Sequence, residues 1–132
     1  MTKTILLCDD EASIMRAAEF KLTRAGYRVR CACDGEEGWR EILAQRPDLV
    51  VTDCQMPRLD GLQLAARIQG TPEMADLPVV MLTGKGFEAS YRESAARWGV
   101  LRVLAKPFSP RELLKLVGEI VGPAQPAQET LA

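Results

Sequence analysis

Five side chains that could take part in phosphoryl transfer follow strand-like apolar runs at widely separated points of the chain: Asp9, Asp10, Asp53, Thr83 and Lys106. Carboxylates attract a hard cation such as Mg²⁺, which proteins usually hold by one or two carboxylates. Asp53 can complete such a metal shell, and an aspartate can also act as a carboxylate nucleophile. Lys106 can pair with phosphoryl oxygens as a point charge, and Thr83 can donate its hydroxyl to one of them.

Each of these residues also has an ordinary structural explanation when it is taken alone. Asp9 and Asp10 could lie in a solvated loop or cap a helix, Lys106 could be a surface lysine, and Thr83 could simply end a strand. In an open parallel sheet, however, ligands bind in the crevice at the carboxyl ends of the strands. Residues that follow four different strands therefore meet at one edge, and this joint arrangement favours a site.

The elements that must position these residues alternate along the chain in strand and helix patterns, which is typical of an α/β domain with a parallel sheet. The expected strands are Thr4 to Cys8, Arg28 to Cys33, Leu49 to Thr52, Pro78 to Leu82 and Leu101 to Leu104. The third and fourth are continuously apolar, so helices should cover both of their faces.

Start and stop signals delimit the helices between these strands. Gly26 is expected to end the first helix, Asp34 and Asp60 to cap the second and third, and Pro47 to close the second. Ser109-Pro110-Arg111-Glu112 is a capping box with proline at the first helical position. In the fourth helix Phe87, Tyr91, Ala95 and Trp98 recur at helical spacing and are predicted to face the core.

Composition restricts the class of protein. The chain has 132 residues, which is the size of one domain, and 17 basic residues nearly balance 18 acidic ones, so no net field draws it to nucleic acid or membrane. No apolar run is long enough to span a bilayer, and a cytoplasmic protein is expected. Histidine is absent from the sequence, which excludes serine-histidine triads and a phosphohistidine on this chain. Any phosphodonor must therefore be another molecule.

The cysteines are predicted to be structural, with redox or metal-binding roles as the alternative. None of the four forms a Cys-x-x-Cys pair. Cys31 and Cys33 alternate along an expected strand, where small buried hydrophobes belong.

The residues assembled above resemble the response regulator receiver family of two-component signalling, over about the first 121 residues. The segments that carry the resemblance are Ile5-Leu6-Leu7-Cys8-Asp9-Asp10-Glu11, Val50-Val51-Thr52-Asp53-Cys54-Gln55-Met56-Pro57 with Asp60-Gly61, Val79-Val80-Met81-Leu82-Thr83-Gly84, and Lys106-Pro107-Phe108. The resemblance implies a flavodoxin-like doubly wound (βα)5 fold with strand order 2-1-3-4-5. Residues 1–121 would form this receiver domain, and residues 122–132 a flexible C-terminal tail.

The same resemblance assigns roles to individual residues. Asp53 would accept the phosphoryl group. Asp10 would bind Mg²⁺ directly, Asp9 mainly through water, and the Gln55 backbone carbonyl would be a further ligand. Lys106 would contact the phosphoryl group, and its bond to Pro107 would be cis.

Positions near the phosphoryl group should affect its access and its lifetime. Glycine at position 84 would leave the group accessible beside Thr83. Gln55 and Lys85 lie two residues after Asp53 and Thr83, and by the resemblance such positions flank the path of the hydrolytic water and tune dephosphorylation.

One position departs from the family pattern. An aromatic residue usually stands three residues before the lysine and turns inward when the threonine moves, whereas this chain has Val103 there. The phosphorylation site is unaffected by this change, but the coupling to output must differ. Movement of the segment from Gly84 to Trp98 is the expected substitute.

The implied function is a phosphoacceptor switch, with its own phosphorylation and dephosphorylation as its only chemistry, rather than an enzyme. Its partners would be a sensor histidine kinase or histidine phosphotransfer protein and a downstream target, with a homodimer through the fourth helix, fifth strand and fifth helix as a further possibility. No direct contact with nucleic acid or membrane is expected.

Three alternatives remain open from the sequence. A degenerate receiver could act as a phosphorylation-independent interaction module. An aspartate-nucleophile phosphatase would need a second aspartate where the chain has Gln55. An FMN-binding protein is opposed by the acidic first turn, because negative charge there repels phosphate.

Overall fold

Five parallel strands form a single sheet in the order β2-β1-β3-β4-β5 in the computed structural model, which describes residues 2–84 and 88–123. The elements follow one another as β1 (Thr4–Cys8), α1 (Ala12–Arg24), β2 (Arg28–Ala32), α2 (Gly35–Ala44), β3 (Leu49–Asp53), α3 (Gly61–Gln69), the short 3₁₀ helix η1 (Pro72–Met74), β4 (Val79–Thr83), α4 (Glu88–Arg97), β5 (Val100–Ala105) and α5 (Pro110–Val121). The predicted fold class and strand order are confirmed.

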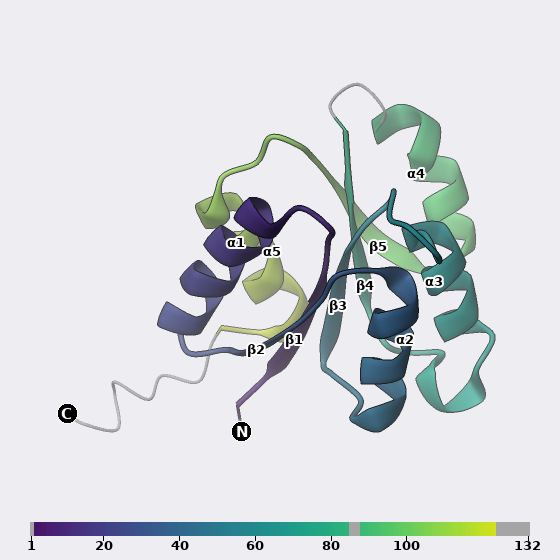
Figure 1. Ribbon diagram of the computed structural model, residues 1–132, viewed down its shortest axis with the longest axis horizontal. Coiled ribbons are helices and arrows are strands. Elements are labelled where there is room, and N and C mark those ends of the chain that lie inside the picture. The colour runs from purple at the N-terminus through teal and green to yellow at the C-terminus, as the bar shows by residue number, and fades with distance from the viewer. Residues whose placement is uncertain (1, 85–87, 124–132) are drawn as a thin grey trace.

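Helices cover the sheet on both sides. Helices α1 and α5 lie on one face, and α2, α3 and α4 lie on the other (Figure 1). Every residue of β3 and β4 is buried, as their continuously apolar sequences predict. Strand β2 lies at one edge and is only partly covered.

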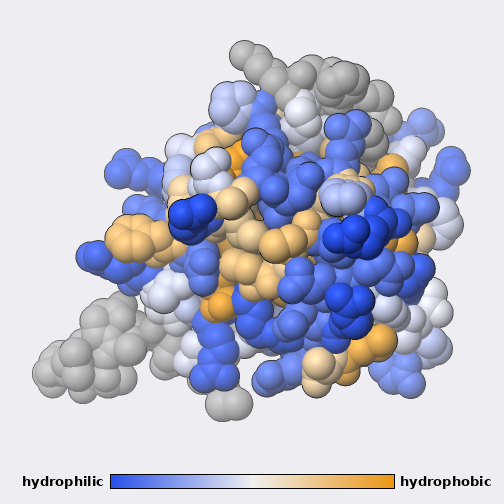
Figure 2. Space-filling model, in the orientation of Figure 1, coloured by the Kyte–Doolittle hydropathy of each residue, from blue (hydrophilic) through white to orange (hydrophobic). Residues whose placement is uncertain are grey.

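Apolar side chains gather in the middle of this view of the surface, between α1 and α2 (Figure 2).

Two separate cores result from the alternation of side chains along each strand. In β1, Leu6 packs into the core beneath α2 and α3, whereas Ile5 and Leu7 pack into the core beneath α1 and α5. In β4, Met81 belongs to the first core and Val80 to the second. The sheet is thus held rigidly between two apolar layers, which fixes the positions of its strand ends.

Helix boundaries agree with the capping signals of the sequence. The side chains of Asp34 and Asp60 accept hydrogen bonds from backbone N–H groups at the starts of α2 and α3, and Ser109 forms the expected capping box with Glu112. Gly26 follows α1 with a positive φ of 110°. These caps satisfy backbone donors that would otherwise lack partners.

The observed strand ends differ slightly from those predicted. Asp53 and Thr83 are the last residues of β3 and β4 rather than the first residues after them. Cys33, expected within β2, lies beyond its end and is exposed, so the prediction that it is a buried strand residue is wrong. Backbone hydrogen bonds of the parallel ladder, which the apolar pattern does not report, decide where each strand ends.

The predicted core-facing stripe of the fourth helix is only partly correct. Ala95 is buried, but Trp98 lies after the end of α4 and 40% of it is exposed. Phe87 and the side chain of Tyr91 lie outside the described residues. The helix ends before Trp98, at Arg97, and Gly99 follows with a positive φ of 78°, so the helical spacing no longer fixes the direction of the indole.

The loop after β3 packs tightly against the start of α2. Arg58 adopts a φ of 70° and its guanidinium bonds the Asp34 carboxylate at 3.0 Å. A Cβ on Gly35 would lie 1.9 Å from the Leu59 carbonyl oxygen, and one on Gly61 would lie 2.4 Å from the Asp53 carbonyl oxygen. Both glycines are therefore required by close backbone approach, and both fix the chain that follows Asp53.

No helix in residues 2–84 and 88–123 has the length and apolar character needed to cross a membrane.

A stability comparison tests the close approach at Gly35. Gly35→Ala should lower the free energy of unfolding by about 1–3 kcal/mol, because its methyl group has no space beside Leu59. Gly118→Ala, inside α5, is the matched control, because its methyl group would meet only the Tyr27 hydroxyl oxygen at 3.7 Å. It should raise stability by up to about 1 kcal/mol. Urea unfolding curves measure both, and equal effects would contradict the packing described for Gly35.

Candidate functional site

Three carboxylates from two strand ends converge at the carboxyl edge of the sheet. Asp9 and Asp10 follow β1, and Asp53 ends β3, which lies next to β1 in the sheet. One oxygen of each carboxylate lies within 4.8 Å of one oxygen of the others. Asp9 and Asp53 are buried, whereas Asp10 is exposed. The structure thus brings together the acidic residues that the sequence predicted.

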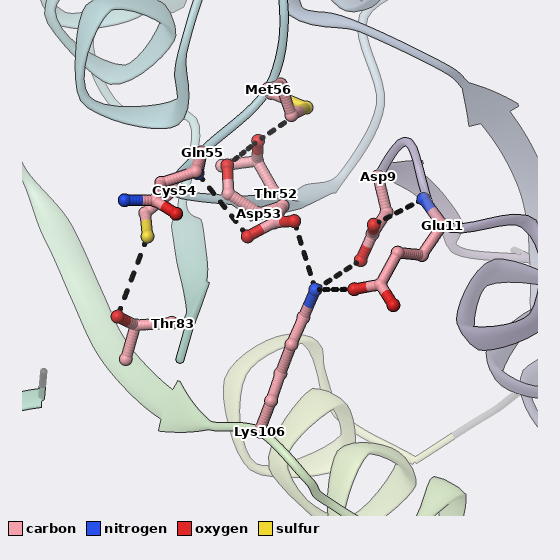
Figure 3. A network of polar contacts seen from close by, with 9 residues as sticks. All are labelled: Asp9, Glu11, Thr52, Asp53, Cys54, Gln55, Met56, Thr83 and Lys106. Carbon is pink, nitrogen blue, oxygen red and sulfur yellow. Dashed lines mark hydrogen bonds and ion pairs between the residues drawn. The ribbon is translucent and has the colours of Figure 1, made fainter. Parts of the chain in front are cut away.

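Lys106 extends from the turn after β5 into this acidic cluster. Its ammonium nitrogen lies 3.0 Å from Asp53 Oδ2 and 3.2 Å from Asp9 Oδ2, and 2.9 Å from Glu11 Oε1. Figure 3 shows the three carboxylates around the nitrogen. Only 14% of the lysine side chain is exposed, so water screens these contacts weakly.

The pKa values in the cluster reflect this arrangement. Burial, reinforced by the neighbouring Asp53 carboxylate, raises the pKa of Asp9 above its usual value, although Glu11 N–H and Lys106 oppose the change. Burial alone would lower the pKa of Lys106, but the carboxylates around it outweigh this effect and raise that pKa. The lysine is therefore a permanent cation at neutral pH.

The cluster suits a hard divalent cation. Asp9 Oδ2 is buried and accepts no hydrogen bond, although the Lys106 ammonium lies nearby. Its other oxygen, Oδ1, accepts the Glu11 backbone N–H at 2.8 Å, which fixes the orientation of the carboxylate. Oxygen ligands with excess negative charge are the donors that Mg²⁺ prefers. The residues present therefore fit that ion.

Thr83 lies at the end of β4, beside the strand that ends in Asp53. It is fully buried, and its hydroxyl accepts a hydrogen bond from the Cys54 thiol, with 3.6 Å between sulfur and oxygen. The backbone carbonyl of Thr83 accepts the Lys106 N–H at 2.7 Å, which joins the two predicted switch residues through the main chain. Thr83 and the turn that carries Lys106 thus lie together at the ends of the adjacent strands β4 and β5.

The remaining predicted positions differ in how they relate to this cluster. The Gln55 backbone N–H reaches Asp53 Oδ1 at 3.4 Å, and the Gln55 side chain is exposed. Gly84 is exposed, and the peptide bond before Pro107 is cis. Val103 is half-buried and packs against the core under α4. Lys85 lies outside the described residues.

Two contacts of the site were missed by sequence reasoning. Glu11 was seen only as part of an acidic turn, although it makes the shortest contact to Lys106. Cys54 was treated as a structural thiol, although it contacts Thr83. The position of Cys54 directly after Asp53 was a usable signal, since neighbours of a strand-end residue share its edge of the sheet. For Glu11, only the three-dimensional position of Lys106 reveals the pairing.

An apolar pocket opens beside Lys106. It lies between α1 and the turn before α5, has a volume of about 210 Å³, and is lined by Ser13, Ile14, Ala17, Ala18, Lys106, Pro107, Phe108 and Pro110. The pocket shares Lys106 with the acidic cluster, so a molecule that binds there lies next to the site.

Comparison with known proteins places this site in a family. The model of the response regulator receiver domain matches residues 5–118. A relative from Bacillus subtilis, the alkaline phosphatase synthesis transcriptional regulatory protein PhoP, is 38% identical over 86% of the chain and 46% of its own length. The phosphate regulon transcriptional regulatory protein PhoB of Pseudomonas aeruginosa is 37% identical over 92% of the chain and 54% of its own length. The chain spans about half the length of these curated relatives.

Solved structures agree with this assignment. A putative response regulator from Chloroflexus aurantiacus is 36% identical and superposes with a TM-score of 0.86, covering 92% of this chain and 98% of that one. The chemotaxis protein CheY4 of Vibrio cholerae is 27% identical, with a TM-score of 0.85 over 91% of this chain and 99% of that one. Together with the acidic cluster and its lysine, these matches show that the chain belongs to the response regulator receiver domain family of two-component signalling.

Proposed function

We propose that Asp53 accepts a phosphoryl group in an Mg²⁺-dependent reaction, and that the resulting change of shape controls a downstream partner. A receiver domain is a phosphoacceptor signalling module rather than a classical enzyme. The observation that carries the proposal is the position of the Asp53 carboxylate, which lies beside two further carboxylates and within 3.0 Å of the Lys106 ammonium.

The proposed reaction is a displacement at phosphorus. A carboxylate oxygen of Asp53 attacks the phosphorus of a phosphohistidine on another protein, and the phosphorus–nitrogen bond breaks. Its electron pair returns to the imidazole nitrogen, which takes up a proton, and Asp53 becomes an acyl phosphate. Because the chain contains no histidine, the phosphodonor must be a separate molecule.

Asp10, Asp53, the Gln55 backbone carbonyl and, through water, Asp9 would hold the magnesium ion. When bound, the ion neutralises charge on the phosphoryl oxygens. Asp9 cannot easily move toward it, because its Oδ1 is held by the Glu11 N–H at 2.8 Å. Asp10 is exposed and free of that constraint, which supports its assignment as the direct ligand.

Lys106 and Thr83 would bind the phosphoryl group and so respond to phosphorylation. The lysine would pair with a phosphoryl oxygen, since it already lies 3.0 Å from the oxygen of Asp53. Thr83 would exchange its contact with Cys54 for a hydrogen bond to the phosphoryl group. Gly84 leaves the approach open because it has no side chain.

The lifetime of the acyl phosphate would depend on Gln55 and Lys85. The Gln55 side chain is exposed directly beside Asp53, where it can affect the approach of the hydrolytic water. Lys85 is assigned the same role from its place in the sequence alone.

A receiver domain implies a histidine kinase as partner. The kinase, or a histidine phosphotransfer protein, would dock at the pocket between α1 and the turn before α5. Its apolar lining and its continuity with Lys106 would place a docked phosphohistidine beside Asp53. Residues 1–121 would form the functional receiver, with residues 122–132 as a tail.

Output would use the face formed by α4, β5 and α5. Leu101 and Trp98 are exposed there, and a surface cavity of about 210 Å³ lies between α4 and β5. Val103 is β-branched and packed against the core, so it cannot swing as a large aromatic ring would. The moving element would instead be the segment 84–98. The same face could bind a downstream target or a second copy of the chain.

Labelling tests the phosphoacceptor. With Mg²⁺ and acetyl phosphate, intact mass spectrometry should show one added phosphoryl group, because the Asp53 carboxylate lies in the acidic cluster and within 3.0 Å of the Lys106 ammonium. Asp53→Asn should show none. Equal labelling of both proteins would reject Asp53, and no labelling of the wild type by any phosphodonor would favour a degenerate receiver.

Measurements of Mg²⁺ affinity test the roles assigned to Asp9 and Asp10. Asp9→Asn should weaken Mg²⁺ binding about tenfold, as expected for a group acting through water, and Asp10→Asn should weaken it clearly more. Asp60→Asn, which keeps an oxygen that can cap α3, is the control and should leave the affinity unchanged. Calorimetric titration measures all three, and a larger loss in Asp9→Asn would reverse the assigned roles.

Hydrogen exchange tests the output. Fluoroberyllate with Mg²⁺ should change the protection of backbone amides in residues 84–98, because the fixed Val103 leaves this segment as the element that responds. The α2 amides serve as the internal control. A change confined to residues near Asp53 would reject output through α4.

A further inference from the structure

We propose that Glu11 is a positioning residue, which holds the Lys106 ammonium in the unphosphorylated protein and competes with the phosphoryl group for it. The inference rests on the proposed function, because it concerns how available Lys106 is to the phosphoryl oxygens. Glu11 immediately precedes α1 and Lys106 immediately follows β5, so the pair joins two distant turns across the mouth of the site (Figure 3).

Geometry identifies Glu11 as a full partner of the lysine. Its Oε1 lies 2.9 Å from Lys106 Nζ, compared with 3.0 Å for Asp53 and 3.2 Å for Asp9. The contact is a hydrogen bond as well as an ion pair, and charge-assisted bonds of this length are the stronger kind. Glu11 therefore lies as close to the ammonium as the phosphoacceptor itself does.

Other uses of Glu11 do not account for its position. Within the described residues, the carboxylates close enough to share a cation are Asp9, Asp10 and Asp53, and Glu11 is not among them. Glu11 occupies the position before the first turn of α1, yet its side chain makes no capping hydrogen bond. Its carboxylate is instead directed to Lys106.

The ammonium cannot keep all of its partners when a phosphoryl group arrives. Its nitrogen donates hydrogen bonds to Asp53 and Glu11 and lies 3.2 Å from Asp9 Oδ2, so a phosphoryl oxygen has to enter among three carboxylates. Asp9 and Asp53 are buried, whereas 56% of the Glu11 side chain is exposed. Water can replace the lysine at Glu11 at little cost, so Glu11 is the partner that is released. The phosphoryl group must nevertheless overcome that contact.

The first measurement uses the metal-free protein. In Glu11→Gln, proton exchange between the Lys106 ammonium and water, followed by nitrogen-detected NMR, should be at least about twofold faster than in the wild type. Glu73→Gln removes an equal charge from an exposed residue in η1, at the opposite end of the sheet, and should have no effect. Unchanged exchange in Glu11→Gln would overturn the claim that Glu11 holds the lysine.

The second measurement is a double-mutant cycle on binding of Mg²⁺-fluoroberyllate, which mimics the phosphoryl group. Glu11→Gln should tighten binding about two- to fivefold when Lys106 is present, the size of a partly exposed ion pair. In a Lys106→Ala background the same substitution should have a clearly smaller effect. Equal effects in both backgrounds would show that Glu11 acts only through its charge, and would overturn the proposal, as would weaker binding by Glu11→Gln.

These two measurements separate the inference from the function on which it rests. If the wild type fails to bind fluoroberyllate, the phosphoacceptor role of Asp53 fails, and the competition fails with it. The metal-free measurement still decides in that case whether Glu11 holds Lys106.

Discussion

The pairing of Lys106 with buried carboxylates is the interaction on which the rest of the site depends. Asp9 and Asp53 are both buried at neighbouring strand ends, and two like charges there would repel each other without a cation. The Lys106 ammonium lies within 3.2 Å of both and supplies that cation before any metal binds. In the proposed function, phosphorylation would be an exchange of partners around a single lysine, which would link the chemistry of Asp53 to the turn after β5.

The fold fixes the positions of the residues that would take part in this exchange. Asp53 and Thr83 end adjacent parallel strands that are buried on both faces, so the packed core holds the main chain at both residues in place. The loop after Asp53 is fixed in turn by Gly61, where a Cβ would lie 2.4 Å from the Asp53 carbonyl oxygen, and by the ion pair between Arg58 and Asp34. By contrast, Asp10, Gln55 and Glu11 are exposed at the mouth, where ligands must enter and leave.

Sequence reasoning predicted the parallel sheet and the convergence of Asp9, Asp10, Asp53, Thr83 and Lys106, because parallel strands bring their carboxyl ends to one edge. The strand order came from the family resemblance. Sequence reasoning did not predict features that depend on the direction in which a side chain points. The pairing of Glu11 with Lys106 joins residues 95 apart in the sequence, and no local pattern reports it. The exposure of Trp98 was missed because helical spacing loses its meaning after α4 ends.

A crystal structure of the Mg²⁺-fluoroberyllate complex tests the central claim most directly, because it shows which partners Lys106 keeps. The account predicts the beryllium on an Asp53 carboxylate oxygen, with the Lys106 nitrogen bonded to a fluorine and separated from Glu11, whose contact is 2.9 Å in the unphosphorylated protein. An adduct on any other carboxylate, or a lysine still bonded to Glu11 with no contact to fluorine, would contradict it.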